Sequence, residues 1–421
     1  MAKSESKEEE IVPLSSKASI IEKVRELIKS SSLQFRALKF VLLIGAMSFF
    51  ADFVYEGSRG VIGPYLAFLG ASAFTVAVVT GFGEFVGYAW RLVSGSLSDK
   101  TGQFWFITIC GYVIQMASVP LLALVGSWQM AAVLIILERF GRATRNPPRD
   151  VMLSYAAQEM GGYGWVFGAH EALDQFGALF GPLAAASILA WRGDYRFAFA
   201  VLLIPALIMI SLLAIARLTY PHPEEMNDIP PNLDTKGLPN VFWLYLSGAI
   251  FVAIGFADFP FMAYHLEKMY IVSTSMVPIF YAVAMGMSGL GSLLFGRLFD
   301  RVGIIILVPL TVLSALFAPL VFFGGFWPAL IGIALWGLGM GVHESIIPAA
   351  VSLMVPVQRR ASAYGLFTAC YGIFWFLGSA VIGSLYSVSL PLLIAFCLVT
   401  EFAAIPLFFL VKQQISHNSR V

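Results

Sequence analysis

The sequence predicts an all-helical integral membrane protein, with twelve transmembrane helices arranged as two pseudo-symmetric six-helix bundles. Three observations support this fold class. Of the 421 residues, 59% are hydrophobic and only 12% are charged, apolar segments long enough to cross a membrane recur along the chain, and the second half repeats motifs of the first. Soluble domains average about 25% charged residues. The composition therefore excludes a water-soluble globule, a nucleic-acid-binding protein, a secreted disulfide scaffold and a disordered chain.

Residues 1–37 form a predicted polar N-terminal tail. A secretory signal is excluded because no apolar segment lies near the start of the tail. Apolar residues recur at helical spacing between Ile20 and Ile28, and basic residues such as Lys23 and Arg25 oppose them. This pattern is typical of an amphipathic helix on an anionic membrane surface, and equally of a solvated, partly helical tail.

From Leu38 onward, the apolar segments are each long enough to cross a hydrocarbon core of about 30 Å. The predicted N-terminal bundle, residues 38–216, has spans at 38–66, 72–96, 104–125, 128–147, 165–190 and 196–216. The predicted C-terminal bundle, residues 240–411, has spans at 240–266, 273–298, 304–323, 326–350, 362–386 and 389–411. Between the bundles, the proline-rich interval 217–239 is a predicted linker, and residues 412–421 form a predicted C-terminal tail.

Lysine and arginine residues are concentrated on one predicted side of the membrane. That side carries both termini and the linker, together with Lys100, Arg142, Arg145, Arg149, Arg297, Arg301, Arg359 and Arg360. The other side has only Arg192, Arg196 and Lys268, and Arg59 if its helix end is assigned to that side. Cytoplasmic loops are enriched in such residues. We therefore expect a multi-pass protein of the cell membrane with both termini and the linker in the cytoplasm.

An internal repeat links the two halves. The second span ends in Gly-Ser-Leu-Ser-Asp-Lys-Thr-Gly and the eighth in Gly-Arg-Leu-Phe-Asp-Arg-Val-Gly, 201 residues later. Phe-Ala-Asp-Phe around Asp52 recurs around Asp258, and Pro148 and Pro348 are expected to close the fourth and tenth spans. The repeated glycine, acidic and basic residues of the first motif are Gly95, Asp99, Lys100 and Gly102 in one half and Gly296, Asp300, Arg301 and Gly303 in the other.

Twelve predicted spans, a central linker and this motif after the second span together resemble the major facilitator superfamily of secondary transporters. The resemblance implies a monomer in the lipid bilayer that binds a small-molecule substrate between its bundles and needs no cofactor. It also implies that the repeated motif gates the cytoplasmic side, with Arg139 or Arg142 as the ionic partner of Asp99. The alternative is that the motif is a tight turn that only sets topology.

The fifth span carries a second motif that resembles one of the family, Gly177-Ala-Leu-Phe-Gly181-Pro182, and the family associates it with antiporters. The next glycine of that pattern is Ala185 here. At about 100° per residue, His170, Asp174, Gly177 and Gly181 share one narrow stripe, which we expect to pack against the other bundle near the eighth span. His170 and Asp174 either fix this contact by hydrogen bonding or take part in transport.

Ionisable residues at membrane depth are the candidate functional residues, because a buried charge needs a partner or water. In the family, spans 1, 4, 7 and 10 line the central cavity, and here each carries one acid: Asp52, Glu138, Asp258 and Glu344. Asp52 and Asp258 have no cation within one turn and are the first candidates for proton coupling, followed by Glu344 beside His343. The rest of the predicted substrate and proton pathway is Glu56, Arg59, Glu84 and Glu171, although Glu56–Arg59, Glu84–Arg91 and Glu138–Arg142 could instead be structural ion pairs.

These features predict secondary active transport by alternating access, with proton coupling and export of an organic compound as further expectations. Aromatic residues such as Tyr88, Tyr371 and Trp375 either line a cavity for that compound or face lipid.

Divalent-metal transport is an alternative, because carboxylate and imidazole groups bind such ions. A different class is a membrane-embedded enzyme or a sensor. Motifs of a metallohydrolase, a serine hydrolase or a phosphate-binding loop are not present, so no catalytic residue, metal, cofactor or direct use of ATP is expected.

Overall fold

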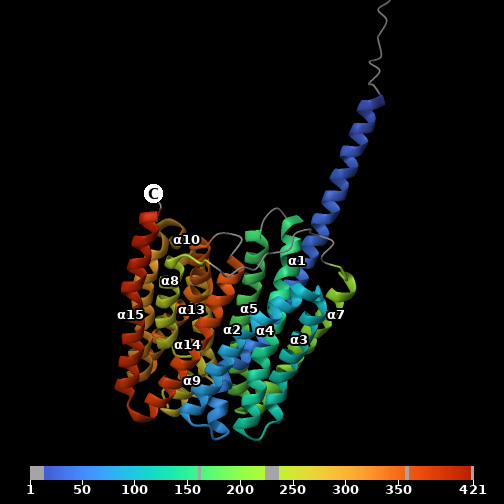
Figure 1. Cartoon of the computed structure of the whole chain (residues 1–421). Coiled ribbons are helices and arrows are strands. Elements are labelled where there is room, and N and C mark those ends of the chain that lie inside the picture. Colours follow the sequence, from blue (N-terminus) through green and yellow to red (C-terminus); the bar gives the residue numbers. More distant parts are fainter. Residues whose placement is uncertain (1–13, 160–162, 223–236, 356–359, 419–421) are drawn as a thin grey trace, which may run out of the picture.

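The computed structural model describes residues 14–159, 163–222, 237–355 and 360–418. Within these ranges, some side chains lie outside the described part, among them those of residues 14–33, Asp99, Gly296, Asp300, His343 and Glu344. The described residues form helices and no strand, so the predicted all-helical class is confirmed. The start of the first helix within the bundle and the end of the last helix lie at the same end of the molecule (Figure 1). We call this the terminal end and the opposite one the distal end.

The first half of the chain contributes α1 (Leu14–Phe68), α2 (Ala73–Thr101), α3 (Phe104–Leu121), the short 3-10 helix η1 (Leu122–Leu124), α4 (Trp128–Glu159), α5 (Tyr163–Arg192), α6 (Tyr195–Val201) and α7 (Leu203–Thr219). The second half contributes α8 (Asn240–Gly255), α9 (Phe259–Lys268), α10 (Val277–Val302), η3 (Gly303–Ile306), α11 (Leu307–Ala315), α12 (Phe317–Phe323), α13 (Phe326–Met354), α14 (Arg360–Val388) and α15 (Leu390–Asn418). Across the two halves, α2 packs against α14, α5 against α10, and α1 against α9.

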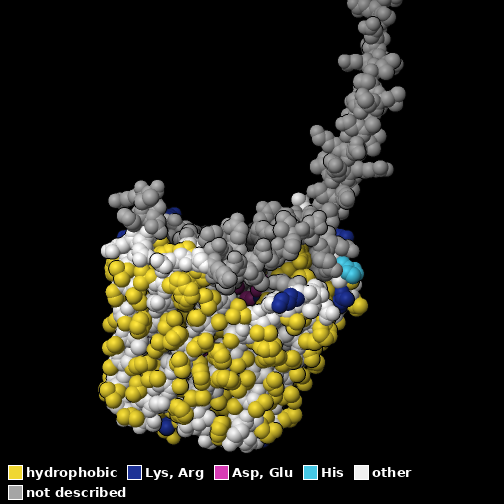
Figure 2. All heavy atoms as spheres, viewed as in Figure 1, with side chains coloured by type: hydrophobic (Ala, Val, Ile, Leu, Met, Phe, Trp, Pro, Cys, Tyr) yellow, Lys and Arg dark blue, Asp and Glu magenta, His cyan; other side chains and the backbone are white. Residues whose placement is uncertain are grey.

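Nine segments of the described residues are long and apolar enough to cross a membrane. Two shorter apolar helices, Val277–Ser292 and Phe326–Val342, coincide with the predicted eighth and tenth spans, and the charge-rich α4 coincides with the fourth. Hydrophobic side chains cover the face seen in Figure 2, with lysine and arginine near its two ends. The chain is therefore a multi-pass membrane protein, while the full count of twelve crossings stays a prediction.

The prediction that Pro148 and Pro348 close their helices is wrong, because α4 and α13 both continue through these positions. A proline has no N–H, so Pro147 leaves the carbonyl of Ala143 without its intrahelical donor. The Ser94 hydroxyl of α2 donates a hydrogen bond to this carbonyl oxygen at 2.7 Å. The neighbouring helix thus satisfies the freed backbone group, which is how membrane helices tolerate proline.

Replacing Ser94 with alanine is expected to lower the free energy of unfolding by about 1–3 kcal/mol, because the Ala143 carbonyl would lose its donor in a buried contact. Thermal unfolding of the purified protein measures the change. The matched control is Ser211→Ala, whose hydroxyl bonds only to the Leu207 carbonyl of its own helix at an exposed position. Equal losses in the two variants would contradict a special role for Ser94.

The longer α4 also corrects the placement of Arg142, Arg145 and Arg149. We expected them to add positive charge to the cytoplasmic side of the membrane, but all three lie within α4, and the Arg145 side chain is only 1% exposed. Because α4 continues beyond the end of its apolar sequence, these arginines lie on a helix inside the protein rather than in a surface loop. The positive charge of the terminal end then rests on other residues, such as the exposed Lys100 and Arg301.

The single span predicted at 240–266 is two helices, α8 and α9, separated by residues 256–258. Asp258 caps α9, since its Oδ1 atom accepts a hydrogen bond from the N–H of Phe259 at 3.0 Å. Pro260 lies in the first turn of α9, where a missing N–H leaves no hydrogen bond broken. The matching Asp52 lies inside the uninterrupted α1. The duplicated Phe-Ala-Asp-Phe motif therefore adopts two different backbone conformations.

The repeated motif ends α2 and α10 in tight turns. Gly102 and Gly303 have positive φ angles of 65° and 71°, a conformation that favours glycine. Gly95, inside α2, packs near Pro147 of α4, because a Cβ atom at Gly95 would lie 3.4 Å from the Pro147 Cβ. Lys100 and Arg301 are exposed, whereas Asp99, Gly296 and Asp300 lie outside the described side chains. The gating function of the motif stays a prediction.

The glycine stripe of α5 does not pack where we expected. A Cβ atom at Gly177 would overlap the carbonyl oxygen of Phe49, and one at Gly181 would overlap that of Phe53, so the two glycines of the stripe, which precede Pro182, pack on α1 rather than near the eighth span. Small residues allow two helix backbones to come this close. The α10 helix meets α5 elsewhere, with Gly289 near Gln175. The stripe therefore joins two helices of the same half.

Candidate functional site

A cavity of about 640 Å³ lies between the two halves of the molecule. Its lining comes from α1, α2, α4 and α5 on one side and from α10, α13 and α14 on the other. On α1, which enters from the terminal end, the lining stops at Arg59, well before the helix ends at Phe68. The exposed fraction of the lining side chains rises from 4% at Arg59 to 44% at Asp150. The cavity therefore opens toward the terminal end.

Arg59 forms the floor of the cavity. Its Nη2 atom lies 2.6 Å from Asp258 Oδ1 on α9 and 3.0 Å from Glu84 Oε1 on α2. The Nη2 atom of Arg139 on α4 lies 3.1 Å from the same Glu84 oxygen. Below this floor cluster of Arg59, Glu84, Arg139 and Asp258, a Cβ atom at Gly63 would overlap the Pro260 carbonyl of α9. The two halves are thus in direct contact at the distal end.

A second polar contact joins the halves beside the floor cluster. The Tyr281 hydroxyl of α10 donates a hydrogen bond to the Glu56 carboxylate of α1. Both residues are buried, and the Tyr281 ring packs on Phe259 with 4.3 Å between ring centroids. Sequence reasoning missed Tyr281, because nothing distinguishes it from the other tyrosines of the apolar segments.

Asp52 is paired through arginines of α4. Its Oδ1 atom lies 3.4 Å from Arg145 Nη2, and its Oδ2 atom lies 3.8 Å from Arg142 Nη2. The Arg145 Nε atom also donates to Gln115 Oε1 at 2.6 Å, and the Gln115 amide donates to Glu138 Oε1 at 3.0 Å. This chain of contacts leads away from the cavity, so Glu138 is held between α3 and α4 and is not part of the lining.

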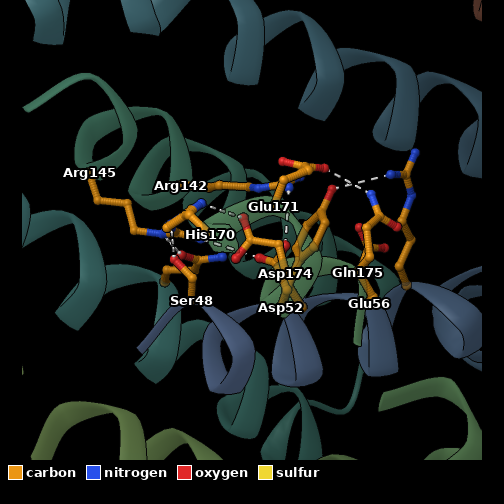
Figure 3. A network of polar contacts seen from close by, with 12 residues as sticks. Ser48, Asp52, Glu56, Arg142, Arg145, His170, Glu171, Asp174 and Gln175 are labelled. Carbon is orange, nitrogen blue, oxygen red and sulfur yellow. Dashed lines mark hydrogen bonds and ion pairs between the residues drawn. The ribbon is translucent and has the colours of Figure 1, made fainter. Parts of the chain in front are cut away.

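His170 connects α5 to α1 at the cavity wall, as Figure 3 shows. The Ser48 Oγ atom lies 2.7 Å from His170 Nε2, and Arg149 Nη1 lies 3.2 Å from the same Oγ. Arginine can only donate, so Ser48 accepts a hydrogen bond from Arg149, and the histidine tautomer sets the direction of its hydrogen bond with His170 Nε2. The His170 Nδ1 atom lies 3.6 Å from Asp174 Oδ2. Because Ser48 is fully buried, this serine–histidine–aspartate arrangement joins α1 to α5 and presents no exposed nucleophile.

The opposite wall differs in chemistry. The second half of the chain contributes no charged side chain to the described lining. Its lining residues are Met285, Ser292, Met340, Tyr364, Phe367, Thr368, Tyr371 and Trp375, from α10, α13 and α14. We call this the aromatic wall and the surface formed by α1, α2, α4 and α5 the charged wall.

The predicted pathway residues are only partly brought together. Asp52, Glu56, Arg59, Glu84 and Glu171 line the cavity, as do Arg139, Arg142, His170 and Asp174, which we had assigned to the gating motif and the α5 contact. Glu138 and Asp258 are buried behind the described lining. His343 and Glu344 lie outside the described side chains. Arg145 pairs with Asp52, and Arg149 bonds to Ser48 beside His170, although we had assigned both arginines to the charges of the cytoplasmic side.

The ion pairs that we weighed within single helices are not the ones that the structure records for these acids. Glu84 pairs with Arg59 and Arg139 rather than with Arg91, and Glu138 pairs with Arg139. Asp52 and Asp258, selected because no cation lies within one turn, both pair with arginines of other helices. In the described part of the chain, no group of three or more histidine, cysteine or acidic side chains could hold a metal ion.

Comparison with known proteins adds to this geometry. The family model described as Major Facilitator Superfamily matches residues 41–379. An uncharacterized protein of Mycobacterium tuberculosis strain H37Rv is 38% identical over 383 residues, which cover 89% of this chain and 93% of that protein. An uncharacterized MFS-type transporter of Methanocaldococcus jannaschii is 25% identical over 83% of this chain and 89% of its own length. A structure of a mutant of the nucleoside transporter NupG has a TM-score of 0.69 at 15% identity, covering 88% of this chain and all of that one.

Proposed function

The chain belongs to the major facilitator superfamily, and on this premise we propose that it is a proton-coupled secondary transporter that moves a small organic molecule by alternating access. The observation that carries the proposal is the cavity between the two halves, open toward the terminal end and closed at the distal end by contacts between α1 and α9. Substrate sites of such transporters lie between the repeats near the middle of the bilayer.

In this proposal, residues 38–216 and 240–411 are the two bundles that move relative to each other, joined by the linker at 217–239 and flanked by the tails 1–37 and 412–421. With both termini in the cytoplasm of the cell, the cavity faces inward. The monomer is the transporting unit. Opening to the other side requires the floor cluster and the Glu56–Tyr281 contact to separate.

Proton coupling is supported by the position of the acids. Asp52 and Glu56 are buried, line the cavity and come from the same helix. The Glu56 carboxylate accepts its hydrogen bond from the other half of the molecule, so its protonation state bears directly on a contact that must break. Carboxylates in such buried positions are suited to carry protons. Export, as the direction of transport, is supported by the likeness of Gly177-Ala-Leu-Phe-Gly181-Pro182 to the antiporter motif.

Alternating access is tested with spin labels at the two ends of the molecule. One pair, Leu124→Cys with Tyr270→Cys, reports the distal end, where these side chains are 79% and 93% exposed. The other pair, Leu218→Cys with Gln413→Cys, reports the terminal end, with Cys110, Cys370 and Cys397 replaced by alanine. We expect each pair to show two distance populations in lipid nanodiscs, and the two ends to change in opposite directions with pH. A single population at both ends under all conditions would refute the proposed function.

The coupling acids are tested in the same background. The Asp52→Asn and Glu56→Gln variants are expected to remain folded and to lose the pH dependence of the distance populations, because each mimics the protonated acid. The amide introduced by Glu56→Gln retains an oxygen that can accept the Tyr281 hydroxyl proton. Asp258→Asn is also expected to reduce transport driven by a proton gradient. The control is Asp194→Asn, an exposed helix cap at the distal end that asparagine also suits. An unchanged pH response in both Asp52→Asn and Glu56→Gln would exclude these acids from coupling.

A further inference from the structure

The geometry points to an amphipathic organic anion as the substrate class of the central cavity, with its carboxylate or phosphate at Arg91 and its apolar body against the aromatic wall. This inference rests on the proposed transport function and specifies what the cavity binds. A volume of about 640 Å³ falls in the range of cavities that hold drug-sized molecules. The two walls then decide the chemistry of the occupant.

The aromatic wall favours an apolar or aromatic body. Phe367, Tyr371 and Trp375 follow one another along α14 at helical spacing, with ring centroids of neighbours 6.0 and 5.7 Å apart. Met285 of α10 and Met340 of α13 extend the same surface. Methionine and aromatic side chains gain by contact with apolar groups and adapt to their shape. A fully polar substrate would leave this wall without a partner.

The charged wall favours a negative group, because most of its carboxylates already have cationic or amide partners. Arg149 binds Asp150 through two nitrogens at 2.9 and 2.7 Å. The Gln175 amide donates to Glu171 at 2.9 Å, and the other acids of this wall are paired as described above. Arginine therefore neutralises Asp52, Glu84 and Asp150, and the hydrogen bond from Gln175 occupies Glu171.

Arg91 is the exception among the cations of this wall. In the part of the chain that the structure describes, no carboxylate lies within 4.0 Å of its guanidinium, and its Nε atom has no hydrogen-bond partner. The guanidinium carbon lies 5.5 Å from the centre of the Tyr88 ring. Guanidinium groups bind carboxylate and phosphate groups through two parallel hydrogen bonds. An anionic ligand would supply the partner that Arg91 lacks.

The position of Arg91 allows one ligand to contact both the guanidinium group and the aromatic wall. It lies on α2 between two close contacts with α14: a Cβ atom at Gly372 would lie 2.7 Å from the Tyr88 Cβ, and one at Gly365 would overlap the Leu92 side chain. Arg91 is therefore at the edge where the charged wall meets α14. A ligand that places its anionic group at Arg91 can lay its body along the α14 surface of Phe367 and Tyr371 without crossing the cavity.

The test is ligand-induced thermal stabilisation of the purified full chain in lipid nanodiscs. The probes are naphthoate, naphthyl phosphate, neutral naphthamide, cationic naphthylmethylamine, and acetate as an anion without a ring. We expect naphthoate or naphthyl phosphate to raise the melting temperature, and acetate, naphthamide and the amine to do so much less. The Arg91→Gln variant is expected to weaken binding of the anion by about tenfold or more, since a hydrogen bond to a charged group is lost. The two anions separate carboxylate from phosphate recognition.

Two further variants keep the test decisive. Arg91→Lys retains the charge and is expected to recover part of the affinity, which a purely structural role of Arg91 would not predict. Arg192→Gln removes the same charge at an exposed distal position and is expected to leave binding unchanged. Preferential binding of the amine, or anion binding that is the same in Arg91→Gln and the native protein, would overturn the assignment. Because the spin-label distances are measured without ligand, that outcome is distinguishable from failure of the transport proposal.

Discussion

In the Arg59→Met variant, the conformation with the cavity open toward the terminal end is expected to lose about 3–5 kcal/mol of stability. This is the usual cost of removing one partner from a buried ion pair. Arg59 is 4% exposed and lies within 3.0 Å of both Glu84 and Asp258. Without it, Asp258 keeps only its hydrogen bond from the Phe259 N–H, and Glu84 keeps Arg139. The loss falls on the contact that holds the two halves together at the distal end.

Part of this loss is expected to appear as a change in conformation. If the floor cluster holds the distal end closed, the Leu124–Tyr270 spin-label distance becomes longer in Arg59→Met and the Leu218–Gln413 distance becomes shorter. A change of about 1.4 kcal/mol shifts the ratio of two states tenfold, so the effect lies well within the range of the method. The melting temperature reports the remainder.

Two comparisons separate the ion pair from general damage. The double variant Arg59→Met/Asp258→Asn removes the unpaired acid and is expected to recover part of the melting temperature, because a neutral amide is cheaper to bury than an unpaired charge. Arg192→Met makes the same replacement at an exposed position and is expected to change little. If Arg59→Met matched Arg192→Met in both stability and distances, the floor cluster would not be the distal closure.

The Gly181→Ala variant is expected to lose about 3 kcal/mol or to fail to fold, because overpacking against fixed atoms has no cheap relief. The added methyl group would lie 2.9 Å from the Gly57 backbone nitrogen and would overlap the Phe53 carbonyl oxygen. Both neighbours are backbone atoms of α1, so the two helices must move apart. The yield of monodisperse protein in size-exclusion chromatography and its melting temperature measure this effect.

The chain offers a matched control for that substitution in Gly286 of α10, where an added Cβ atom meets nothing within 4 Å. Alanine is the better helix former by about 0.5–1 kcal/mol, so Gly286→Ala is expected to be neutral or slightly stabilising. The two variants should therefore differ in sign as well as in size. A Gly181→Ala protein as stable as Gly286→Ala would show that the α1–α5 contact is looser than described.

The fold was largely predictable because membrane segments are set by composition and length. Every predicted span corresponds to one helix or to consecutive shorter helices. The errors in helix boundaries occur where a contact with another residue outweighs the sequence pattern. Pro147 does not end α4 because Ser94 of α2 supplies the missing donor, and the 240–266 span is interrupted where Asp258 caps a new helix.

The candidate site was predictable only in part, for a physical reason. Buried acids are rare at membrane depth, so Asp52 and Glu56 were found from their positions alone. Their partners were not, because sequence spacing reveals neighbours within one helix, whereas Arg59 and Asp258 are 199 residues apart. Tyr281 carries no charge and so had no distinguishing signal. Asp258 faces an arginine rather than the open cavity, which no spacing rule anticipates.

The interruption between α8 and α9 makes the two copies of the duplication mechanically unequal. An unbroken helix such as α1 transmits a tilt along its whole length, whereas two short helices joined by a three-residue segment can tilt separately. The joint sits beside the carboxylate that Arg59 holds. We therefore expect release of that carboxylate to free a joint in the second half only, so that the two halves of the molecule move unequally during transport.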